Sequence, residues 1–367
     1  MMKFLNLYSN ISNLNTSITN IKKLLKKNQI IGGPEVEKFE YNFSKYVNSK
    51  YCISVANGTD ALEIAIESLK LPVDSEVIIP VNTWISAAEA VVRNNLKIVF
   101  CDINLLDYSI DLNDLKKKIN RKTKLIIPVH LYGVPSNMNE IIKLSKKYNI
   151  KIIEDCAQAH GSYIKNKHVG TFGDLGTFSF YPSKNLGCFG DGGAIITNNK
   201  KLSIICRRIK NHGSLSKYDH EVIGRNSRLD SIQAVILNNN LKKLKKSIKI
   251  KNRNVNLYLK NLKEIKKISF IKYNKNFVNS HHQFVIRVKE RDKLRKFLKK
   301  NQIETMIHYP YMLDELKVFK KHSIKRTKLI NSKNLGKKIL SLPISEDHKK
   351  RDILQVINII KKFYKTT

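Results

Sequence analysis

Residues 176–195, GTFSFYPSKNLGCFGDGGAI, contain one lysine, Lys184, in a stretch that predicts a buried strand, a turn and a glycine-rich loop. Lysine is abundant in this chain, in which Lys and Arg together number 68. Many lysines occur in runs such as KKLKKSIKIKNR, residues 242–253, which we interpret as solvated helix faces. Lys184 stands alone among small and apolar residues, so its position needs a chemical explanation.

The stretch belongs to a series of short apolar runs rich in β-branched residues. They lie near residues 76, 97, 124, 151, 175 and 193, and amphipathic segments such as DALEIAIESLK, residues 60–70, separate several of them. Continuous apolar strands that alternate with helices predict an α/β fold with a mostly parallel sheet between helices. No helix fits between the runs near 175 and 193, so we expect an antiparallel pair there, at an edge of the sheet.

The length of the chain and a change of pattern predict two domains. The chain has 367 residues, more than one hydrophobic core usually organises. After Arg228 the apolar runs give way to long basic helices and a few short strands. We therefore predict a large domain over residues 1–245 and a smaller α+β domain over residues 246–367.

Composition limits the classes of partner. The formal net charge of +38 suggests nucleic-acid binding, but the cations are mostly scattered lysines and no nucleic-acid motif accompanies them. We interpret the charge as background and expect no nucleic-acid partner. No apolar run reaches 18 residues and the N terminus lacks a secretory pattern, so we expect no membrane span. Five widely spaced cysteines predict free thiols in the cytoplasm and no metal site.

Predicted strand ends place functional side chains where parallel sheets bind ligands. In NGTD, residues 57–60, Gly58 and Thr59 open a helix whose free amides can hold a phosphate. Asp155 ends an apolar strand in EDCAQAHG, and a buried carboxylate needs a partner. Trp84, the single tryptophan, follows another strand and can cover a flat ring.

Ser179 and Lys184 follow a further predicted strand. A phosphate cradle, a stacking ring, an acid and an isolated lysine are together what pyridoxal 5'-phosphate requires. A partly buried lysine also loses its proton more readily and becomes a nucleophile. Ordinary alternatives remain open for each part: NGTD as a capped turn, Asp155 paired with a Lys or Arg, and Trp84 in the core.

A series of motifs in the chain resembles the DegT/StrS family of sugar aminotransferases. The motifs run in order from about residue 29 to the C terminus: GPEVEKFE, NGTDAL, NTWISAAEAV, PVHLYG, EDCAQAHGS, GDLGTFSFYPSKNLG, GDGGAIITN, RRIKNHG, GRNSRLDSIQAVIL and HYP. The resemblance implies the aspartate-aminotransferase-like (type I PLP) fold and a homodimer with shared active sites.

The resemblance also implies residue roles. Lys184 would carry the cofactor as a Schiff base, Asp155 would pair with the pyridine nitrogen, and Gln158 would lie beside the ring. Further expected contacts are those to the phosphate (Gly58, Thr59, Ser179, and Asn226 from the second subunit), to the ring face (Trp84) and to the substrate (His308, Tyr309). We expect His160 and His212, which lie in motif segments, to be structural.

The implied reaction transfers an amino group, with glutamate as donor, to C3 or C4 of a nucleotide-linked keto-deoxyhexose, for amino-sugar and surface-glycan synthesis. Relatives that deoxygenate sugars carry histidine in place of the lysine, so Lys184 disfavours the first alternative, a sugar dehydratase. A second alternative is a basic nucleic-acid-binding or regulatory protein. The third, a nicotinamide-dependent oxidoreductase, is disfavoured because GCFGDGG lacks the GxGxxG spacing.

Overall fold

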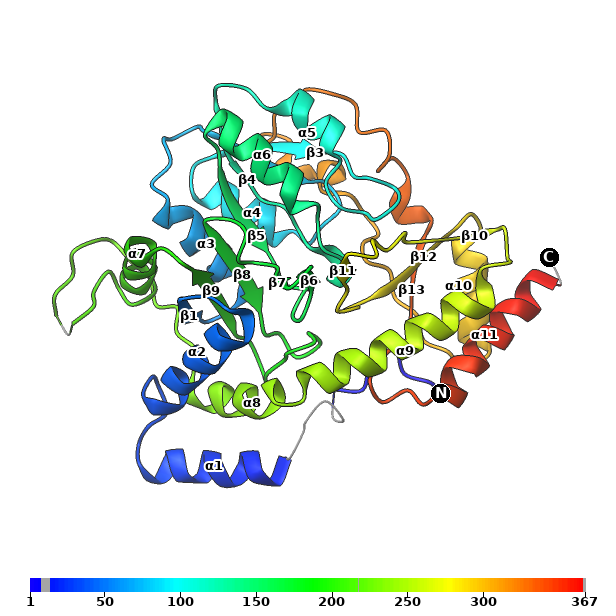
Figure 1. Ribbon diagram of the computed structural model, residues 1–367, viewed down its shortest axis with the longest axis horizontal. Helices are drawn as coiled ribbons and strands as arrows, with labels where there is room; N and C mark the ends of the chain where they lie inside the picture. The colour runs from blue at the N-terminus through cyan, green and yellow to red at the C-terminus, as the bar shows by residue number, and fades with distance from the viewer. Residues whose placement is uncertain (8–13, 217, 366–367) are drawn as a thin grey trace.

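The computed structural model describes residues 1–7, 14–216 and 218–365 and is built around a seven-stranded sheet (Figure 1). The strand order is β1-β9-β8-β5-β4-β2-β3. The strands are β1 (Tyr51–Val55), β2 (Glu76–Pro80), β3 (Lys97–Cys101), β4 (Thr123–Ile126), β5 (Lys151–Asp155), β8 (Leu175–Ser179) and β9 (Gly193–Thr197). Only β9 runs against the others in this sheet, so the mostly parallel sheet is confirmed.

The position of β9 corrects one expectation. β8 and β9 do form an antiparallel pair, but they do not lie at an edge, because β9 also pairs with β1, which takes the edge position. Cys52 and Ser54 interrupt the apolar character of β1, which is why this strand is absent from the series of apolar runs. Its pairing with β9, Tyr51 opposite Thr197, joins residues too distant in sequence for local patterns to reveal.

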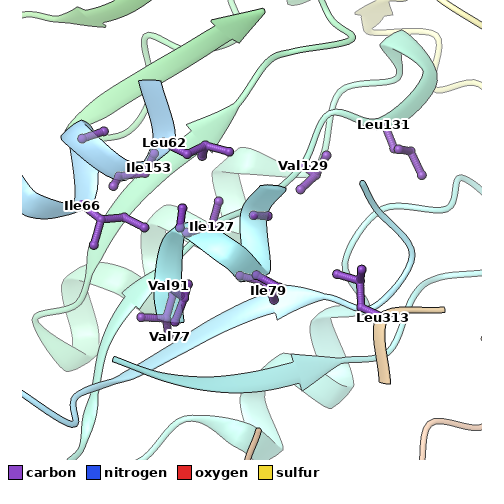
Figure 2. Packing of buried hydrophobic residues seen from close by; sticks show 14 of the residues in the cluster. Leu62, Ile66, Val77, Ile79, Val91, Ile127, Val129, Leu131, Ile153 and Leu313 are labelled. Carbon is purple, nitrogen blue, oxygen red and sulfur yellow. The ribbon is translucent and has the colours of Figure 1, made fainter. Parts of the chain in front are cut away.

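Helices cover both faces of this sheet. In β2, Val77 and Ile79 belong to one apolar cluster and Ile78 to another, which is the alternation expected of a strand buried on both sides. Figure 2 shows the first cluster, in which Leu62 and Val91 come from α3 and α4. The helices in this part of the chain are α1 (Leu14–Lys26), α2 (Pro34–Val47), α3 (Gly58–Ser68), α4 (Ser86–Arg93), α5 (Leu112–Lys118), α6 (Met138–Tyr148), α7 (Lys200–Lys210) and α8 (Ser231–Leu241).

The C-terminal part of the chain forms a separate apolar cluster around an antiparallel sheet of β10 (Ile268–Phe270), β12 (Phe284–Val288) and β13 (Ile339–Leu342). The long helix α9 (Leu244–Leu262) runs from α8 toward this sheet, where α10 (Arg291–Lys300) and α11 (Lys350–Lys365) complete the cluster (Figure 1). Met312 and Leu313 pack back on the large sheet. The domain division at residue 245 stays a prediction.

Short elements connect these parts. They are β6 (Tyr163–Ile164), β7 (Lys167–His168), β11 (Phe277–Val278) and the 3-10 turns η1 (Leu131–Gly133), η2 (Leu313–Glu315), η3 (Lys317–Phe319) and η4 (Leu335–Lys337). Among the described residues, no helix combines the length and the apolar character that a membrane crossing requires.

Glu154, next to Asp155 in β5, anchors the loop that leads into β8. It is fully buried, and its carboxylate accepts hydrogen bonds from the backbone N–H groups of Gly170 (2.8 Å), Phe172 (2.7 Å) and Gly173 (2.7 Å). Its Oε2 also lies 3.0 Å from Nε2 of His130. These contacts hold the pKa of Glu154 below its usual value although burial opposes them. Side chains alternate along a strand, so Asp155 faces the opposite side.

We predict that Glu154→Ala strongly destabilises the protein, because three buried N–H groups and His130 lose their acceptor. Breaking such a buried network costs roughly 3–5 kcal/mol of unfolding free energy. Chemical denaturation monitored by circular dichroism measures this loss. The control Glu140→Ala removes an exposed carboxylate paired with Lys143 and should leave the midpoint unchanged. A Glu154→Ala midpoint equal to wild type would contradict the structural role.

Candidate active site

The segments singled out in the sequence meet at one edge of the large sheet. The strands β1, β2, β5 and β8 run in the same direction, and Gly58, Trp84, Asp155 and Ser179 each lie at or just beyond the carboxyl end of one of them. The carboxyl ends of parallel strands are where α/β sheets bind ligands.

Two helix N-termini approach each other at this edge. A Cβ atom on Gly58, the first residue of α3, would lie 2.6 Å from Cβ of Ser179, so these two predicted phosphate ligands are in contact. Oγ1 of Thr59 is 2.7 Å from Oγ of Ser86, the first residue of α4. Helix N-termini attract anions, so the arrangement suits a phosphate. Asn57 also caps α3, because its side chain accepts the backbone N–H of Asp60. A capped turn and a phosphate site at NGTD are therefore compatible.

Ser86 was not identified from the sequence. A serine that opens a helix is an ordinary helix cap, and nothing in NTWISAAEA distinguishes it from one. Its approach to Thr59 depends on the neighbouring positions of α3 and α4 across the same face of the sheet.

Asp155 is a buried carboxylate whose side chain accepts one hydrogen bond among the described residues. It is 7% exposed, and Oδ1 accepts the backbone N–H of Ala157 at 3.0 Å. No ion pair to Asp155 occurs within residues 1–7, 14–216 and 218–365, but the charge of Lys184 acts on it, so the alternative of a nearby lysine as its partner stays open. Burial raises the pKa of this carboxyl, and the charge of Lys184 opposes that shift. The carboxylate is suited to accept a hydrogen bond from a protonated ring nitrogen.

Lys184 lies in the turn after β8, with its backbone N–H bonded to the carbonyl of Tyr181 at 2.8 Å. Burial lowers the pKa of its amine to about 8, although the negative charge of Asp155 raises it. In the described part of the chain, its Nζ has no hydrogen-bond or ion-pair partner. At a pKa near 8, about a tenth of the amine is neutral at pH 7, far more than for an ordinary lysine. The side chain is therefore available as a nucleophile.

Gln158 and Trp84 meet through Tyr309. The amide of Gln158 accepts the backbone N–H of Tyr132 at 2.7 Å and donates to the hydroxyl of Tyr309 at 2.8 Å. The ring of Trp84 lies 5.5 Å from that of Tyr309. Trp84 is 58% exposed, so the alternative that it is a core residue is wrong. Tyr132 was not identified from the sequence, because its contribution here is a backbone N–H.

His308 joins the same group from the C-terminal part of the chain. Its Nδ1 lies 2.8 Å from Oγ of Ser341, and its carbonyl oxygen accepts a hydrogen bond from the hydroxyl of Tyr132. Burial and the nearby charge of Lys184 lower the pKa of His308 to about 4. A neutral imidazole thus lies within electrostatic range of Lys184, on the side expected for the substrate.

Asn226 is exposed and lies in the loop between α7 and α8. An ordinary role for this Asn would be to cap the long helix that the sequence predicts near Leu229, but α8 begins at Ser231 with Asp230 as its capping residue, so Asn226 does not cap it. Its neighbour Ser227 accepts the backbone N–H of Ala56 at 3.1 Å and thereby ties the loop to the start of α3. Within the described residues, the side chain of Asn226 contacts none of the other predicted site residues.

His160 and the trio of His130, Glu154 and Cys156 belong to the core. His160 is fully buried against the rings of Phe178 and Phe180. Each residue of the trio has one atom that could bind a metal ion, and these three atoms lie within 4.8 Å of one another. The oxygens of Glu154 already accept backbone hydrogen bonds, and Nδ1 of His130 accepts the backbone N–H of Ser136 at 3.0 Å. We therefore assign these residues a structural role.

Comparison with known proteins defines the class as a pyridoxal-phosphate aminotransferase. The model of the DegT/DnrJ/EryC1/StrS aminotransferase family matches residues 13–361, and the chain belongs to this family. Pyridoxal 5'-phosphate is accordingly its cofactor.

Individual relatives are similar over nearly their whole length. The chain is 36% identical to the pleiotropic regulatory protein of Geobacillus stearothermophilus, covering 94% of this chain and 93% of that protein. It is 37% identical to the dTDP-3-amino-3,6-dideoxy-alpha-D-galactopyranose transaminase of Aneurinibacillus thermoaerophilus, covering 94% of each. The crystal structure of S. venezuelae DesV in complex with a ketimine intermediate superposes with a TM-score of 0.95 at 32% identity, covering 99% of this chain and 98% of that one. The predicted α/β fold of the type I class is confirmed.

The residues at the sheet edge fit the cofactor. Gly58 lets the start of α3 lie directly against Ser179, where a Cβ would clash, and so brings the free amides of the helix beside that hydroxyl. The carboxylate of Asp155 keeps acceptor capacity beyond its one N–H contact. The roles of the individual residues stay predictions.

We predict that Gly58→Ala weakens cofactor binding at least tenfold, because the added Cβ would displace the start of α3 from Ser179. Titration of the apoprotein with pyridoxal phosphate, followed by fluorescence, measures the dissociation constant. The control Ser68→Ala changes the last residue of the same helix and should bind as wild type does. A Gly58→Ala constant within twofold of wild type would refute the cradle.

Proposed function

We propose that this protein transfers an amino group from glutamate to the C3 or C4 keto carbon of a nucleotide-linked keto-deoxyhexose, in amino-sugar and surface-glycan synthesis. The observation that carries the proposal is the electrostatic interaction of the partly buried Lys184 with the buried Asp155 at the carboxyl edge of the sheet. The names of its relatives support the substrate class, since the Aneurinibacillus protein acts on a dTDP-linked amino sugar. The cytoplasmic location stays a prediction.

In this proposal each residue has one task. The α3 and α4 N-termini hold the phosphate with Thr59 and Ser179, and Trp84 covers the ring face. Asp155 would accept a hydrogen bond from the protonated pyridine nitrogen and so keep that proton in place. The bound cofactor supplies an electron-withdrawing ring that stabilises negative charge at the donor's α carbon.

Lys184 then performs the proton transfers. Its amine would hold the cofactor covalently, and as a free amine it would accept the proton of the donor's α carbon and donate it again. The lowered pKa of Lys184 leaves a useful fraction of the amine neutral for the first of these steps. Gln158 fixes the hydroxyl of Tyr309 near the ring, and His308 lines the substrate side as a neutral imidazole.

The alternatives are less well supported. A dehydratase of this scaffold would carry histidine at position 184, and this chain has lysine. The relative from Geobacillus is named as a regulatory protein, but a purely regulatory chain has no need of an amine of lowered pKa near a buried acid. We therefore favour the transaminase over a regulatory or nucleic-acid-binding role.

We also propose a homodimer in which Asn226 reaches the phosphate site of the partner subunit. The loop that carries Asn226 exposes a group of large apolar side chains: Leu215, Tyr218, Val222 and Ile223. Ile223 is 91% exposed, and such a group is costly to leave in water. A second copy covering this loop would bury it and bring Asn226 to a neighbouring site.

We predict that Lys184→Ala abolishes transamination while the fold is retained, because Lys184 is the lysine whose charge acts on Asp155 within the described residues. The assay follows 2-oxoglutarate formation from glutamate with a panel of dTDP-, UDP- and GDP-linked keto sugars. Borohydride reduction of the wild-type holoenzyme and peptide mapping should locate the cofactor on Lys184. Lys200→Ala, an exposed lysine of α7, serves as the control. Cofactor found on another lysine would overturn the assignment.

A further prediction concerns the shared site. Lys184→Ala and Asn226→Ala homodimers should each be strongly impaired, whereas their heterodimer should recover about half of wild-type activity. One of its two sites then combines intact Lys184 from one chain with intact Asn226 from the other, by the two-fold symmetry of the dimer. Co-expression with two affinity tags isolates the heterodimer. Absence of recovery would show that Asn226 serves its own chain.

A further inference from the structure

Lys251 is a buried lysine within a run that the sequence presents as a solvated helix face. Lys242, Lys243, Lys245, Lys246 and Lys249 of this run are indeed exposed. Lys251 is only 7% exposed, so for this residue the interpretation is wrong. The reason is the helical period. In α9 the buried residues Ile248, Lys251, Val255 and Tyr258 recur every three or four positions and form one inward stripe.

The buried ammonium leads directly to the residue after Lys184. Nζ of Lys251 donates to Oδ1 of Asn185 at 2.7 Å. The amide nitrogen of Asn185 donates to the carbonyl of Ser280 at 2.9 Å, so both ends of its side chain are held. Ser280 in turn donates its backbone N–H to Gly133 at 3.1 Å, in the loop whose Tyr132 binds Gln158.

Stability alone gives little reason for a cation at this position. No carboxylate lies within ion-pair distance of Lys251 in the described part of the chain, and its partner is a neutral amide. Burial lowers the pKa of Lys251 to about 8, against the more distant charges of Glu346 and Asp347. Burying an ammonium costs more than burying an apolar side chain of similar size. By contrast, the buried Lys118 contacts the carboxylate of Asp114 at 3.0 Å.

We propose that Lys251 is a positioning residue for the transamination: its ammonium fixes the amide of Asn185 and, through the adjacent backbone, holds Lys184 in its partly buried position. The inference rests on the proposed role of Lys184 as the group that carries the cofactor. It assigns Lys251 no contact with cofactor or substrate. Its effect on the reaction passes through Asn185.

The charged and titratable groups around the two lysines define what a test must control. Lys184 interacts electrostatically with Asp155, His160, His282 and His308. Lys251 interacts in the same way with Glu346, Asp347, His160, His281, His282 and His348. No direct interaction between the two amines contributes to either pKa. Removing Lys251 should therefore act on Lys184 through its placement.

The experiment measures the reactivity of Lys184 in the apoprotein. An amine-reactive label is applied in trace amount at a series of pH values, and mass spectrometry of the Lys184 peptide gives the midpoint of its titration. Wild type should show a midpoint near pH 8. In Lys251→Met the released Lys184 should be more exposed to water, so its midpoint should rise and labelling at pH 8 should fall at least threefold.

Matched variants separate positioning from general destabilisation. Lys251→Arg keeps a cationic donor and should restore the wild-type midpoint. Asn185→Ala should reproduce the change, and the double variant should add nothing to it, since both act through one contact. Lys118→Met removes another buried lysine and should leave the Lys184 midpoint unchanged even where it lowers the melting temperature. In the holoenzyme, kcat should fall in Lys251→Met while the KM for the keto sugar stays constant.

Two outcomes overturn two different statements. If Lys184 labels alike in wild type, Lys251→Met and Asn185→Ala, the positioning role is wrong while the proposed function stands. If borohydride reduction places the cofactor on a lysine other than Lys184, the proposed role of Lys184 itself is wrong. Should Lys251→Met not fold, Asn185→Ala tests the same contact from its other side.

Discussion

The mutual electrostatic influence of Asp155 and Lys184 is the interaction on which the active site depends. Burial alone would favour the neutral form of both groups, and each charge opposes the shift of the other. Their relative position is set by the sheet, because β5 and β8 pair in parallel with Asp155 opposite Thr177, two residues before the end of β8. The register between two strands thus determines the distance from acid to amine.

Close backbone approach is the second requirement of this edge. β9 enters the sheet next to β8, and a Cβ on Gly193, its first residue, would lie 2.3 Å from the carbonyl oxygen of Asn57. A Cβ on Gly58 would collide with Ser179 in the same way. Only glycine allows the start of α3 to sit directly on the ends of β8 and β9. Gly193 of GDGGAI therefore supports the position of α3 at the predicted phosphate site.

The sequence predicts the parallel sheet well, because its strands are short apolar runs separated by helices. Asp155 and Lys184 stand out locally, since the first ends such a run and the second follows one. The sequence does not predict the interior position of β9, which depends on pairing with the distant β1. The hydrogen bond from Gln158 to Tyr309 likewise joins residues 151 positions apart. The burial of Lys251 was readable in principle from the helical period of α9, but the surrounding charge run suggested solvent.

The chain shows how one residue type acquires different chemistry from its place in the fold. Among 68 Lys and Arg residues, most remain in water and behave alike. Lys118 is buried against a carboxylate and a carbonyl, which satisfies its charge and makes it structural. Lys251 is buried against a neutral amide, and Lys184 lacks a direct partner while facing the field of Asp155. Burial lowers the pKa of Lys251 and of Lys184 to about 8, since neither amine contacts a carboxylate, and an amine that gives up its proton this readily can perform chemistry.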